Sequence, residues 1–543
     1  MKVAELLIKC LEEEGVNYIF GVPGEENIDI MDALLESRIE FIVTRHETSA
    51  AFMAGTYGRL TGKPGVCLAT LGPGATNLLT GVANANMDLN PIVAITGQAS
   101  LDRQHKISHQ YYDLIHIYEP VTKWNAQIKK GEIVPEVVRK AFQVSTQEKP
   151  GATHIDLPED VAEMEVDSSP LKVTSHSLSE AGDQVIEAAA KLIEQAERPL
   201  ILAGNGITRS NASEQLRALV DKMKIPVVHT FMGKGALPWT NELSLFTAGL
   251  GGNDYITCGF KGSDLILAIG FDIAEYSPVN WNPDGATPIL HIDTEEAETD
   301  ENYPVELNVL GDIKRNLQKL HQVLSPKERD NSWVSTVRTN ALTELEQFKN
   351  DTSFPVKPQK IVADLRAVLK EEDIVISDVG AHKMWMARMY HTYEPNTCLI
   401  SNGLASMGIA VPGAIGAKLA HPERTVVAVC GDGSFQMTGA ELETAKRLNL
   451  PIIVLLWRDD GYGLIEWHQM KKFKRPSHIK FGNPDFVQLA SSYGFEAFQI
   501  KEAEELKPTL EKAIAMNKPV LIDCPVDYRE NMKLTKKLGN IHC

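Results

Sequence analysis

The sequence predicts an α/β protein built from doubly wound parallel sheets. Short apolar runs rich in β-branched residues alternate with helical patterns over nearly all of the 543 residues, and few hairpin signals separate these runs. Strands that are joined through helices pair in parallel, as in repeated βαβ units. The chain is also longer than one hydrophobic core usually serves, which predicts several domains. The clearest strand-like runs are residues 39–44, 65–70, 91–96, 199–204, 264–270, 373–377, 425–431, 451–457 and 519–525.

Two polar stretches divide the chain. Residues 163–183 have no clean period, and residues 325–333 are charged and precede the proline-containing segment FPVKPQK. Such segments are typical of linkers. We therefore expect three α/β domains of similar size, at residues 1–165, 185–325 and 355–535.

Composition and charge indicate a cytoplasmic globular protein. Hydrophobic residues make up 43% and charged residues 23% of the chain, which is ordinary for this class. The formal net charge of −18 argues against nucleic acid or an anionic membrane as a partner. No apolar run is long enough to span a membrane, and the start MKVAELLIKCLEEEGV is typical of an amphipathic helix and not of a signal peptide. Seven cysteines without a CxxC pair favour buried thiols over a disulfide framework or a zinc site.

Two carboxylates follow consecutive strand-like runs in the last third of the chain. Asp432 stands in a Gly-Asp-Gly-Ser turn after TVVAVC, and Asp459 begins a glycine-rich turn after PIIVLLW. Ligands of open parallel sheets bind at the carboxyl ends of the strands. Together with a turn carbonyl, the two carboxylates form a hard oxygen site suited to magnesium or calcium. The amides of Gly433 and Ser434 would then cap a diphosphate held by that metal. As an alternative, both segments are simply tight turns.

Four further segments follow strand-like runs and have both a functional and a purely structural interpretation. Glu47 begins an otherwise small and apolar helix, where it is either a functional carboxylate or an acid stabilised by the helix dipole. The glycine-rich loop 71–77 is either a shelf that lets a ligand approach the backbone or a plain turn before a helix. Residues 378–382 and 401–408 resemble ligand loops, although Met407 alone is more typical of a core residue that fills a gap.

Taken together, these motifs resemble the thiamine diphosphate enzymes of the acetolactate synthase and pyruvate decarboxylase group. The resemblance covers nearly the entire chain, with the motifs in the expected order. It is closest to the catabolic, flavin-independent acetolactate synthases, and the stretches RHETSAAFMAGTYGRLTGKPGVCLATLGPGATNL, IGFDIAEYSPVNW and GDGSFQMTGAELETAKRLNLPI carry it. It implies pyrimidine-binding, central and diphosphate-binding domains in that order. It also implies a homodimer or homotetramer whose sites form between the first domain of one subunit and the third domain of another.

The resemblance also implies how the cofactor is held. Glu47 matches the glutamate that hydrogen-bonds the aminopyrimidine ring and promotes loss of the thiazolium proton. Asp432 and Asp459 match the ligands of Mg²⁺ or Mn²⁺, with the carbonyl of Gly461 as a third. An aspartate at the second position resembles the catabolic branch, because many relatives have asparagine there. Met407 matches the residue that supports the bent cofactor. The other matching cofactor positions are Gly24, Thr70, Asn77, Val379, Gly380, Ala381, His382, Ala405, Gly431, Gly433, Ser434, Tyr462, Gly463 and Leu464.

The favoured activity joins two small 2-oxo acids, converting two pyruvates into 2-acetolactate and CO₂. Gln110 matches a glutamine near the reacting carbons. The preceding His109 has no second histidine beside it, unlike the pair that decarboxylases use. Glu25 supports the alternative, a 2-oxo acid decarboxylase or other carboligase, because decarboxylases have a catalytic aspartate at this position. In a pocket Glu25 would donate a proton, whereas on a βα loop it would be a surface acid.

Two more expectations concern cofactor and substrate. FAD is not expected, because the flavin-binding branch typically has an arginine at the position of Gly270. Synthases that favour 2-oxobutanoate carry tryptophan at the position of His468, and here Trp467 lies one residue away, which favours pyruvate. A third hypothesis is a non-catalytic regulatory subunit with this fold. Such a protein would have lost Glu47 or the metal carboxylates, and all of these are present.

Overall fold

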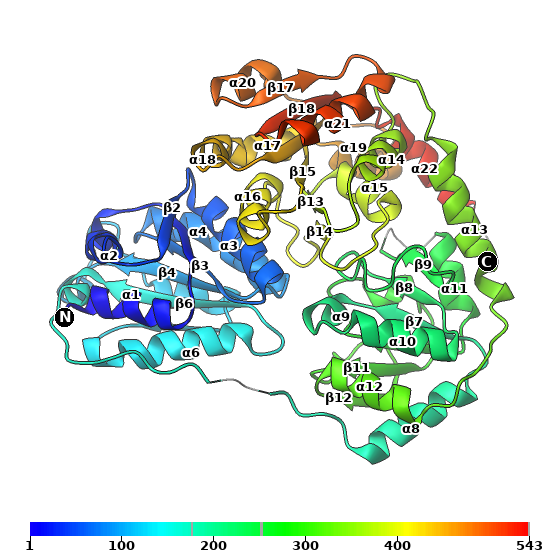
Figure 1. Ribbon diagram of the computed structural model, residues 1–543, viewed down its shortest axis with the longest axis horizontal. Coiled ribbons are helices and arrows are strands. Elements are labelled where there is room, and N and C mark those ends of the chain that lie inside the picture. The colour runs from blue at the N-terminus through cyan, green and yellow to red at the C-terminus, as the bar shows by residue number, and fades with distance from the viewer. Residues whose placement is uncertain (175–176, 250–253, 541–543) are drawn as a thin grey trace.

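The computed structural model describes residues 1–174, 177–249 and 254–540 and contains three six-stranded sheets, in which all the strand pairs are parallel. Figure 1 shows one sheet in each of three bodies, with the N-terminal body at the left, the central one at the lower right and the C-terminal one at the top. The predicted fold class is confirmed. All nine strand-like runs contain a strand, namely β2, β3, β4, β7, β10, β13, β15, β16 and β18.

The first sheet has the strand order β2-β1-β3-β4-β6-β5. One face packs against α1 and α6, and the other face packs against α3 and α4, because successive residues of a strand point to opposite faces. Its strands are β1 (Tyr18–Gly21), β2 (Glu40–Val43), β3 (Gly65–Ala69), β4 (Ile92–Gln98), β5 (Trp124–Gln127) and β6 (Ala152–Pro158). Its helices are α1 (Val3–Glu13), α2 (Ile28–Leu34), α3 (Glu47–Thr61), α4 (Pro73–Met87), α5 (Leu114–Tyr118), α6 (Val134–Thr146) and α7 (Glu159–Ala162).

The central sheet has the order β12-β11-β10-β7-β8-β9. Its strands are β7 (Pro199–Ala203), β8 (Val227–His229), β9 (Ser244–Thr247), β10 (Leu265–Ile269), β11 (Ile289–Asp293) and β12 (Val305–Leu310). Its helices are α8 (Asp183–Gln195), α9 (Asn205–Arg209), α10 (Ser213–Met223), α11 (Tyr255–Gly262) and α12 (Ile313–Val323). The next helix, α13 (Ser332–Gln347), packs on α11 and leads to the third sheet.

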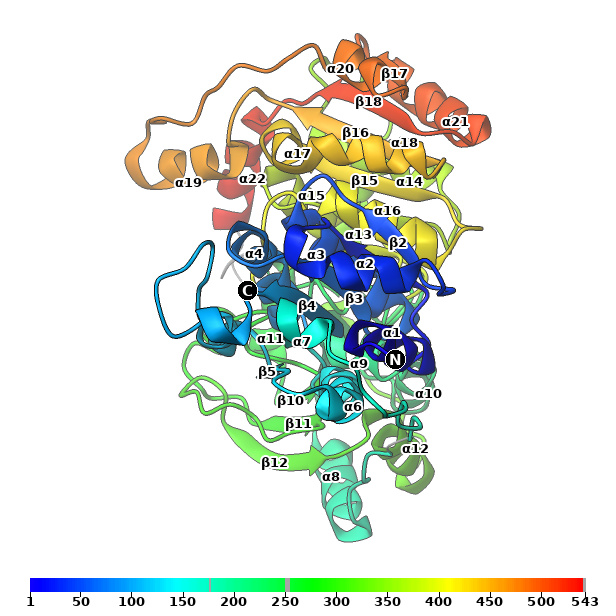
Figure 2. The same ribbon diagram turned by 90° about the vertical axis from the view of Figure 1, so that its left-hand side faces the viewer.

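The third sheet repeats the topology of the first, with the order β14-β13-β15-β16-β18-β17. Its strands are β13 (Ile374–Ser377), β14 (Cys398–Ile400), β15 (Val426–Gly431), β16 (Ile452–Arg458), β17 (Glu496–Gln499) and β18 (Val520–Pro525). Its helices are α14 (Pro358–Val368), α15 (Ala381–Met389), α16 (Ala410–Ala420), α17 (Asp432–Thr438), α18 (Leu442–Arg447), α19 (Gly463–Phe473), α20 (Phe486–Ser492), α21 (Leu506–Met516) and α22 (Arg529–Gly539). In Figure 2, α19 projects at the left, away from the sheet.

The first and third domains share one hydrophobic core. Helix α3 packs directly on α16, and small residues let the two helices approach closely. A Cβ added at Gly416 would lie 2.5 Å from the carbonyl oxygen of Met53, and one at Gly413 would lie 3.0 Å from Thr56 Oγ1. Larger side chains at these glycines would therefore push the two domains apart.

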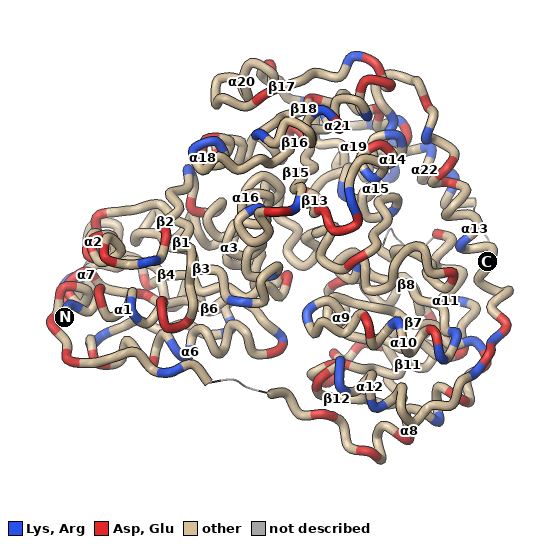
Figure 3. The backbone as a smooth tube through the Cα atoms, in the orientation of Figure 1, with Lys and Arg blue, Asp and Glu red and all other residues tan. Residues whose placement is uncertain are grey.

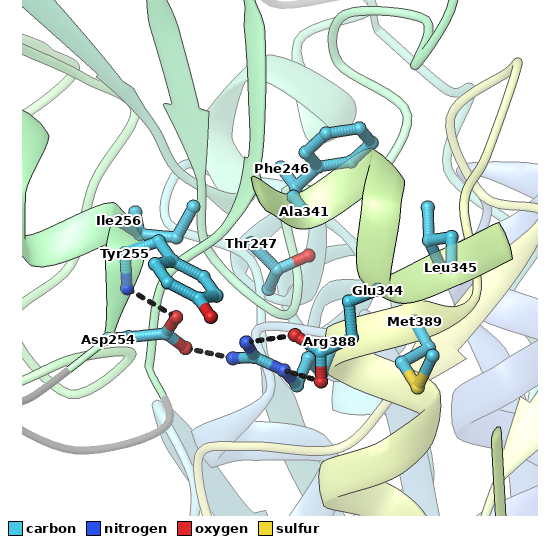
Figure 4. A pocket seen from close by; sticks show the side chains of 10 residues that line it. All are labelled: Phe246, Thr247, Asp254, Tyr255, Ile256, Ala341, Glu344, Leu345, Arg388 and Met389. Atoms are coloured by element: carbon cyan, nitrogen blue, oxygen red, sulfur yellow. Dashed lines mark hydrogen bonds and ion pairs between the residues drawn. The ribbon is translucent and has the colours of Figure 1, made fainter. Parts of the chain in front are cut away.

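A buried charge cluster joins the central domain to the third. Arg388 of α15 forms ion pairs with Asp254, which caps α11, and with Glu344 of α13 at 2.8 Å. Figure 4 shows the guanidinium between the two carboxylates. All three side chains are less than a tenth exposed. The ordinary repulsion between two buried carboxylates is thus offset by a shared cation.

Acidic and basic residues are interspersed along the chain, as Figure 3 shows. Among the described residues, no helix is long and apolar enough to cross a membrane. Five cysteines are buried free thiols, as expected for most of them, whereas Cys258 is disulfide-bonded. The buried free thiols are Cys10, Cys67, Cys398, Cys430 and Cys524.

Candidate cofactor site

The two predicted metal ligands lie at the carboxyl ends of neighbouring strands. Gly431 at the end of β15 is in register with Trp457 of β16, so Asp432 and Asp459 follow adjacent strand ends. Burial and the nearby charge of Asp432 raise the pKa of Asp459 to about 8. Burial also raises the pKa of Asp432. A buried carboxylate whose charge is disfavoured by a neighbouring carboxylate is suited to binding a cation or sharing a proton.

The turn after Asp459 is folded back toward Asp432. The amide of Asp460 donates a hydrogen bond to Asp432 Oδ2 at 2.7 Å, with Asp460 in the left-handed region at φ 55°. Gly463 begins α19 where a Cβ would lie 2.9 Å from Asp459 Oδ2. A side chain at this position would therefore displace the Asp459 carboxylate or the Tyr528 ring, which lies equally close. Leu464 is half-buried in the first turn of α19.

Asn483 belongs to this site, although the sequence did not predict it. Its Nδ2 donates hydrogen bonds to Asp432 Oδ2 and to Asp460 Oδ1, each at 2.8 Å. The segment around it folds over the turn, because Gly461 bridges to Lys480 and the amide of Tyr462 donates to the carbonyl of Ile479 at 3.0 Å. Asn483 stands 51 residues after Asp432 in a stretch with no recognisable motif, so nothing local marks it.

Helix α17 begins at Asp432 beside the predicted 379–382 loop. The hydroxyl of Ser434 donates to the carbonyl of Gly431 at 3.1 Å, and both lie near the start of the helix. A Cβ at Gly431 would lie 3.2 Å from His382 Nδ1, and one at Gly380 would lie 2.7 Å from His382 Cε1. The structure thus brings these loop residues together, with glycines where the His382 imidazole lies against the backbone.

His382 is a neutral imidazole within this loop. Burial lowers the pKa of His382 to about 3. Its Nε2 atom is buried and has no hydrogen-bond partner. Ala381 is buried beside it, whereas Val379 and Gly380 are half-buried and closer to solvent.

Asp378 joins the two predicted ligand loops of the third domain. Its Oδ1 accepts hydrogen bonds from the amides of Val379 and Gly408, both at 2.8 Å, and its Oδ2 accepts one from the amide of Ala410 at 2.9 Å. Because Met407 precedes Gly408 directly, this carboxylate sets the spacing between the 379–382 loop and Met407. Ala405, in the same loop, has a left-handed backbone at φ 56°. Asp378 itself was within a predicted motif but was not predicted as a site residue.

The first domain contributes a second group around Glu47. Glu47 begins α3, and its Oε2 accepts a hydrogen bond from Asn77 Nδ2 at 3.1 Å. A Cβ at Gly74 would lie 2.8 Å from Thr70 Cγ2 and 3.5 Å from Glu47 Oε1. A Cβ at Gly24 would lie 2.4 Å from Thr70 Cβ. The four predicted first-domain positions, Gly24, Glu47, Thr70 and Asn77, are therefore neighbours, although they come from three separate segments.

Gln110 and Glu25 differ in their position relative to the Glu47 group. Gln110 has φ 55° and lies against the glycine-rich loop, where a Cβ at Gly72 would be 2.7 Å from the Gln110 carbonyl oxygen. Glu25 is exposed in this chain, at the start of a 3-10 turn. The carboxylate in contact with Thr70 belongs instead to Glu26, which is buried and accepts the Thr70 hydroxyl at 2.6 Å.

Within one chain, the Glu47 group and the Asp432 group are linked through an intermediate residue. Glu441, which follows α17, accepts hydrogen bonds from the amides of Arg45 and His46 at 3.0 and 3.2 Å, just before Glu47. Across the described parts of the chain, no hydrogen bond or ion pair joins the Glu47 group directly to the Asp432 group. The predicted cofactor positions therefore form two half-sites, one at each end of the chain.

The donor atoms of the half-sites fit a diphosphate ester held through a hard divalent cation. Asp432 and Asp459 offer carboxylate oxygens, the ligands that Mg²⁺ prefers. Buried polar atoms near them lack partners, namely Asn483 Oδ1, His382 Nε2 and the hydroxyl of Tyr528. The start of α17 supplies amides of the kind that bind phosphate. Glu47 and Asn77 offer a carboxylate and an amide for a nitrogen heterocycle.

Three parallel α/β domains with these half-sites define the class of thiamine diphosphate enzymes, and comparison with known proteins agrees. The description "Thiamine pyrophosphate enzyme, N-terminal TPP binding domain" matches residues 1–117, the central domain of the same family matches residues 186–320, and its C-terminal TPP binding domain matches residues 378–524. These matches cover more than half of the chain. The chain belongs to the thiamine pyrophosphate enzyme family.

Its relatives within the family include acetolactate synthases. The chain is 37% identical to the acetolactate synthase of Bacillus subtilis (strain 168), with 99% of this chain and 96% of the relative covered. It is 38% identical to a probable acetolactate synthase large subunit of Methanocaldococcus jannaschii, with 100% and 94% covered. It is 34% identical to the catabolic acetolactate synthase of Raoultella terrigena, with 99% and 97% covered. Catabolic enzymes and large subunits occur at similar identity, so identity does not separate these branches.

Proposed function

We propose that this chain decarboxylates pyruvate and joins the remaining two-carbon unit to a second pyruvate, giving 2-acetolactate and CO₂. The observation that carries the proposal is the Glu47–Asn77 pair, which lies beside the Gly72 turn and Gln110. This arrangement places a carboxylate for proton handling next to an uncharged amide. Near-full-length similarity to acetolactate synthases supports the same reaction.

Asp432, Asp459 and the carbonyl of Gly461 would hold Mg²⁺, and the start of α17 would hold the diphosphate. When bound, thiamine diphosphate supplies the nucleophilic carbon and the electron sink that decarboxylation of a 2-oxo acid requires. The residues of the chain would orient thiamine diphosphate and exchange protons with it. Asp378 fixes the spacing of the two loops that would hold the cofactor.

Glu47 would exchange a proton with a ring nitrogen of the cofactor. The hydrogen bond from Asn77 orients its carboxylate, so that one oxygen is held and the other faces Gly74. Gln110 cannot donate a proton as an acid would. A neutral amide beside the reacting carbons favours capture of a second 2-oxo acid over protonation, which would release an aldehyde.

We also propose that no flavin binds the central domain. At the carboxyl end of its sheet, the buried carboxylate of Glu275 accepts hydrogen bonds from the amide of Asn205 at 3.0 Å and from the hydroxyl of Thr230 at 2.6 Å. This carboxylate covers the start of α9, where a dinucleotide phosphate would otherwise bind. A Cβ at Gly204 would lie 2.3 Å from the carbonyl oxygen of Gly270, so the strand ends are closed together. A yellow preparation with bound flavin would contradict this proposal.

The active enzyme in this proposal is a homodimer or homotetramer in which each site takes the Glu47 half from one subunit and the Asp432 half from another. Co-expression of a Glu47→Ala chain with an Asp432→Ala chain tests this arrangement. Mixed dimers would contain one site with both halves intact and would regain activity that neither variant has alone. Absence of any recovery in purified mixed dimers would place the whole site within one chain.

The reaction is tested by incubating the purified protein with pyruvate, Mg²⁺ and thiamine diphosphate and identifying the product. Acetolactate supports the proposal, and acetaldehyde alone would replace it with the decarboxylase alternative. Glu47→Gln keeps the shape of the side chain but removes its proton handling, so we expect product formation to fall by about 10²–10⁴-fold. Glu36→Gln, at an exposed glutamate of the same domain, is the matched control and should retain full activity.

A further inference from the structure

A cluster of buried polar side chains lies on one face of the first sheet, outside the cofactor half-sites. Thr96 and Gln98 of β4 lie beside Asp156 of β6, and Gln127 of β5 lies on its other side. Residues two apart on a strand share a face, which places these four side chains together. Thr96, Gln98 and Asp156 are at most 1% exposed. Burying a carboxylate is costly unless hydrogen bonds compensate it.

Three donors surround the Asp156 carboxylate. Its Oδ1 accepts the hydroxyl of Thr96 at 2.7 Å, and its Oδ2 accepts Nε2 of Gln127 at 2.9 Å and Nε2 of Gln98 at 3.4 Å. Burial raises the pKa of Asp156 to about 6, while these donors favour the charged form. The carboxylate thus acts as an acceptor toward two glutamine amides at once.

The two glutamines connect Asp156 to residues 99–113, which we name the 99–113 segment. Gln98 Nε2 also donates to the carbonyl of Tyr112 at 3.1 Å. Gln127 Nε2 also donates to Gln104 Oε1 at 3.2 Å, and Gln104 Nε2 donates to the carbonyl of Ala99 at 2.7 Å. The carboxylate is therefore joined to the segment at both its beginning and its end.

Asp156 determines which way the Gln98 amide faces. The Nε2 group must point at acceptors, which are Asp156 and the carbonyl of Tyr112, while Gln98 Oε1 accepts the amide of Ala99 at 2.9 Å. If the amide were reversed, its oxygen would face the carboxylate and the carbonyl. Hydrogen bonding therefore leaves one orientation, and that orientation holds Tyr112.

The held part of the segment leads directly to the Glu47 half-site. Gln110 lies two residues before Tyr112 and packs on Gly72, and the following Gly74 lies beside Glu47. The tip of the segment has no such support, because Ile107 is fully exposed. The position of Gln110 thus depends on how firmly the chain is held at Tyr112.

We propose that Asp156 and Gln98 are positioning residues that hold the 99–113 segment against the Gly72 turn and so set the place of Gln110 beside Glu47. The consequence for catalysis rests on the proposed function, whereas the consequence for the segment does not. Loosening the segment should let water reach the reacting carbons. Products should then shift from acetolactate toward acetaldehyde.

Two variants of the same buried face test this role. Gln98→Met keeps the length of the side chain but loses the contacts with Asp156 and Tyr112. Thr96→Val is the matched control. It removes a donor from the same carboxylate, together with the Thr96–His154 contact at 2.8 Å, but leaves the glutamine contacts on the other oxygen. Amide hydrogen exchange of peptides from the 99–113 segment and the ratio of acetolactate to acetaldehyde are both measured with Mg²⁺ and thiamine diphosphate present.

For Gln98→Met we expect faster exchange around Tyr112 and a fall in the product ratio of about 10-fold, the size of one lost hydrogen bond. Thr96→Val should leave both unchanged. Equal effects of the two variants, or wild-type exchange in Gln98→Met, would overturn the positioning role. If Gln98→Met fails to fold, Gln104→Leu, at a half-buried residue of the segment itself, takes its place. Faster amide exchange of the segment is again expected, and unchanged exchange would refute the positioning role. A wild-type enzyme that makes no acetolactate would refute the proposed function, and the exchange data would still decide the positioning.

Discussion

Asn483 offers a sharp test of the metal half-site, because it contacts a predicted metal ligand and is not itself a predicted ligand. Its Nδ2 donates to Asp432 Oδ2 and to Asp460 Oδ1, each at 2.8 Å. Asn483→Ala removes both hydrogen bonds and leaves the predicted ligands Asp432 and Asp459 in place. The orientation of Asp432 then depends on the amide of Asp460, which donates to Oδ2 at 2.7 Å, and on the amide of Gly433, which donates to Oδ1 at 2.9 Å.

The expected loss follows from the nature of these bonds. A hydrogen bond to a charged acceptor contributes about 1.5–3 kcal/mol, which corresponds to roughly 10–150-fold in affinity. Groups that orient metal ligands contribute about 10–100-fold to metal affinity. Asn483 is half-buried, so water can replace part of its contact with Asp432. We therefore expect Mg²⁺ affinity to fall by about 10-fold, at the lower end of this range.

The measurement is a calorimetric titration of Mg²⁺ at saturating thiamine diphosphate. Asn125→Ala serves as the matched control, because Asn125 also donates one amide hydrogen bond, to the carbonyl of Ile115 at 2.6 Å, but lies in the first domain. The control should bind Mg²⁺ as the wild type does. Unchanged Mg²⁺ affinity in Asn483→Ala, or an equal loss in both variants, would refute the assignment of Asn483 to the metal site.

Two further predictions concern stability. Burial lowers the pKa of His154 to about 3, so the unfolded chain binds a proton that the folded chain excludes, and stability is lost as pH falls below the ordinary value of about 6.5. Between pH 7 and 5.5, the free energy of unfolding measured in urea should therefore fall by about 1 kcal/mol more for the wild type than for His154→Phe. An equal fall in both proteins would contradict this. Arg388→Met removes the cation that Asp254 and Glu344 share, and among the described residues only Glu344 keeps a second cation, Lys537 at 3.4 Å. The variant should cost about 3–5 kcal/mol of unfolding free energy, whereas Arg388→Lys should cost less. A neutral effect of the methionine would show that the buried carboxylates are neutralised in another way.

The sequence was sufficient for much of the fold, because the deciding signals are local. Apolar runs of strand length identified β15 and β16, and the alternation with helices predicted parallel pairing. Consecutive strands joined by a helix are commonly neighbours, so the proximity of Asp432 and Asp459 follows from the order of residues along the chain. Strands with weaker patterns were missed, among them β5 and β17, in which no residue is fully buried.

The residues that connect segments could not be predicted in this way. Asn483 reaches Asp432, and Asp378 joins two loops, through hydrogen bonds between residues that share no local period. Gln98 and Asp156 meet because β4 and β6 are adjacent, although α5, β5 and α6 separate them in the chain. Which of the adjacent acids Glu25 and Glu26 contacts Thr70 likewise depends on the local backbone geometry, and the structure places Glu26 there.

The sequence by itself determined that this protein has three parallel α/β domains and that its carboxylate turns lie where such sheets bind ligands. Periodicity and turn chemistry act over a few residues and can be read along the chain. Only the tertiary structure decided which amides orient those carboxylates, how the two ligand loops are spaced and what holds the 99–113 segment. The physical reason is that a hydrogen bond acts over about 3 Å in space, whatever the separation along the chain.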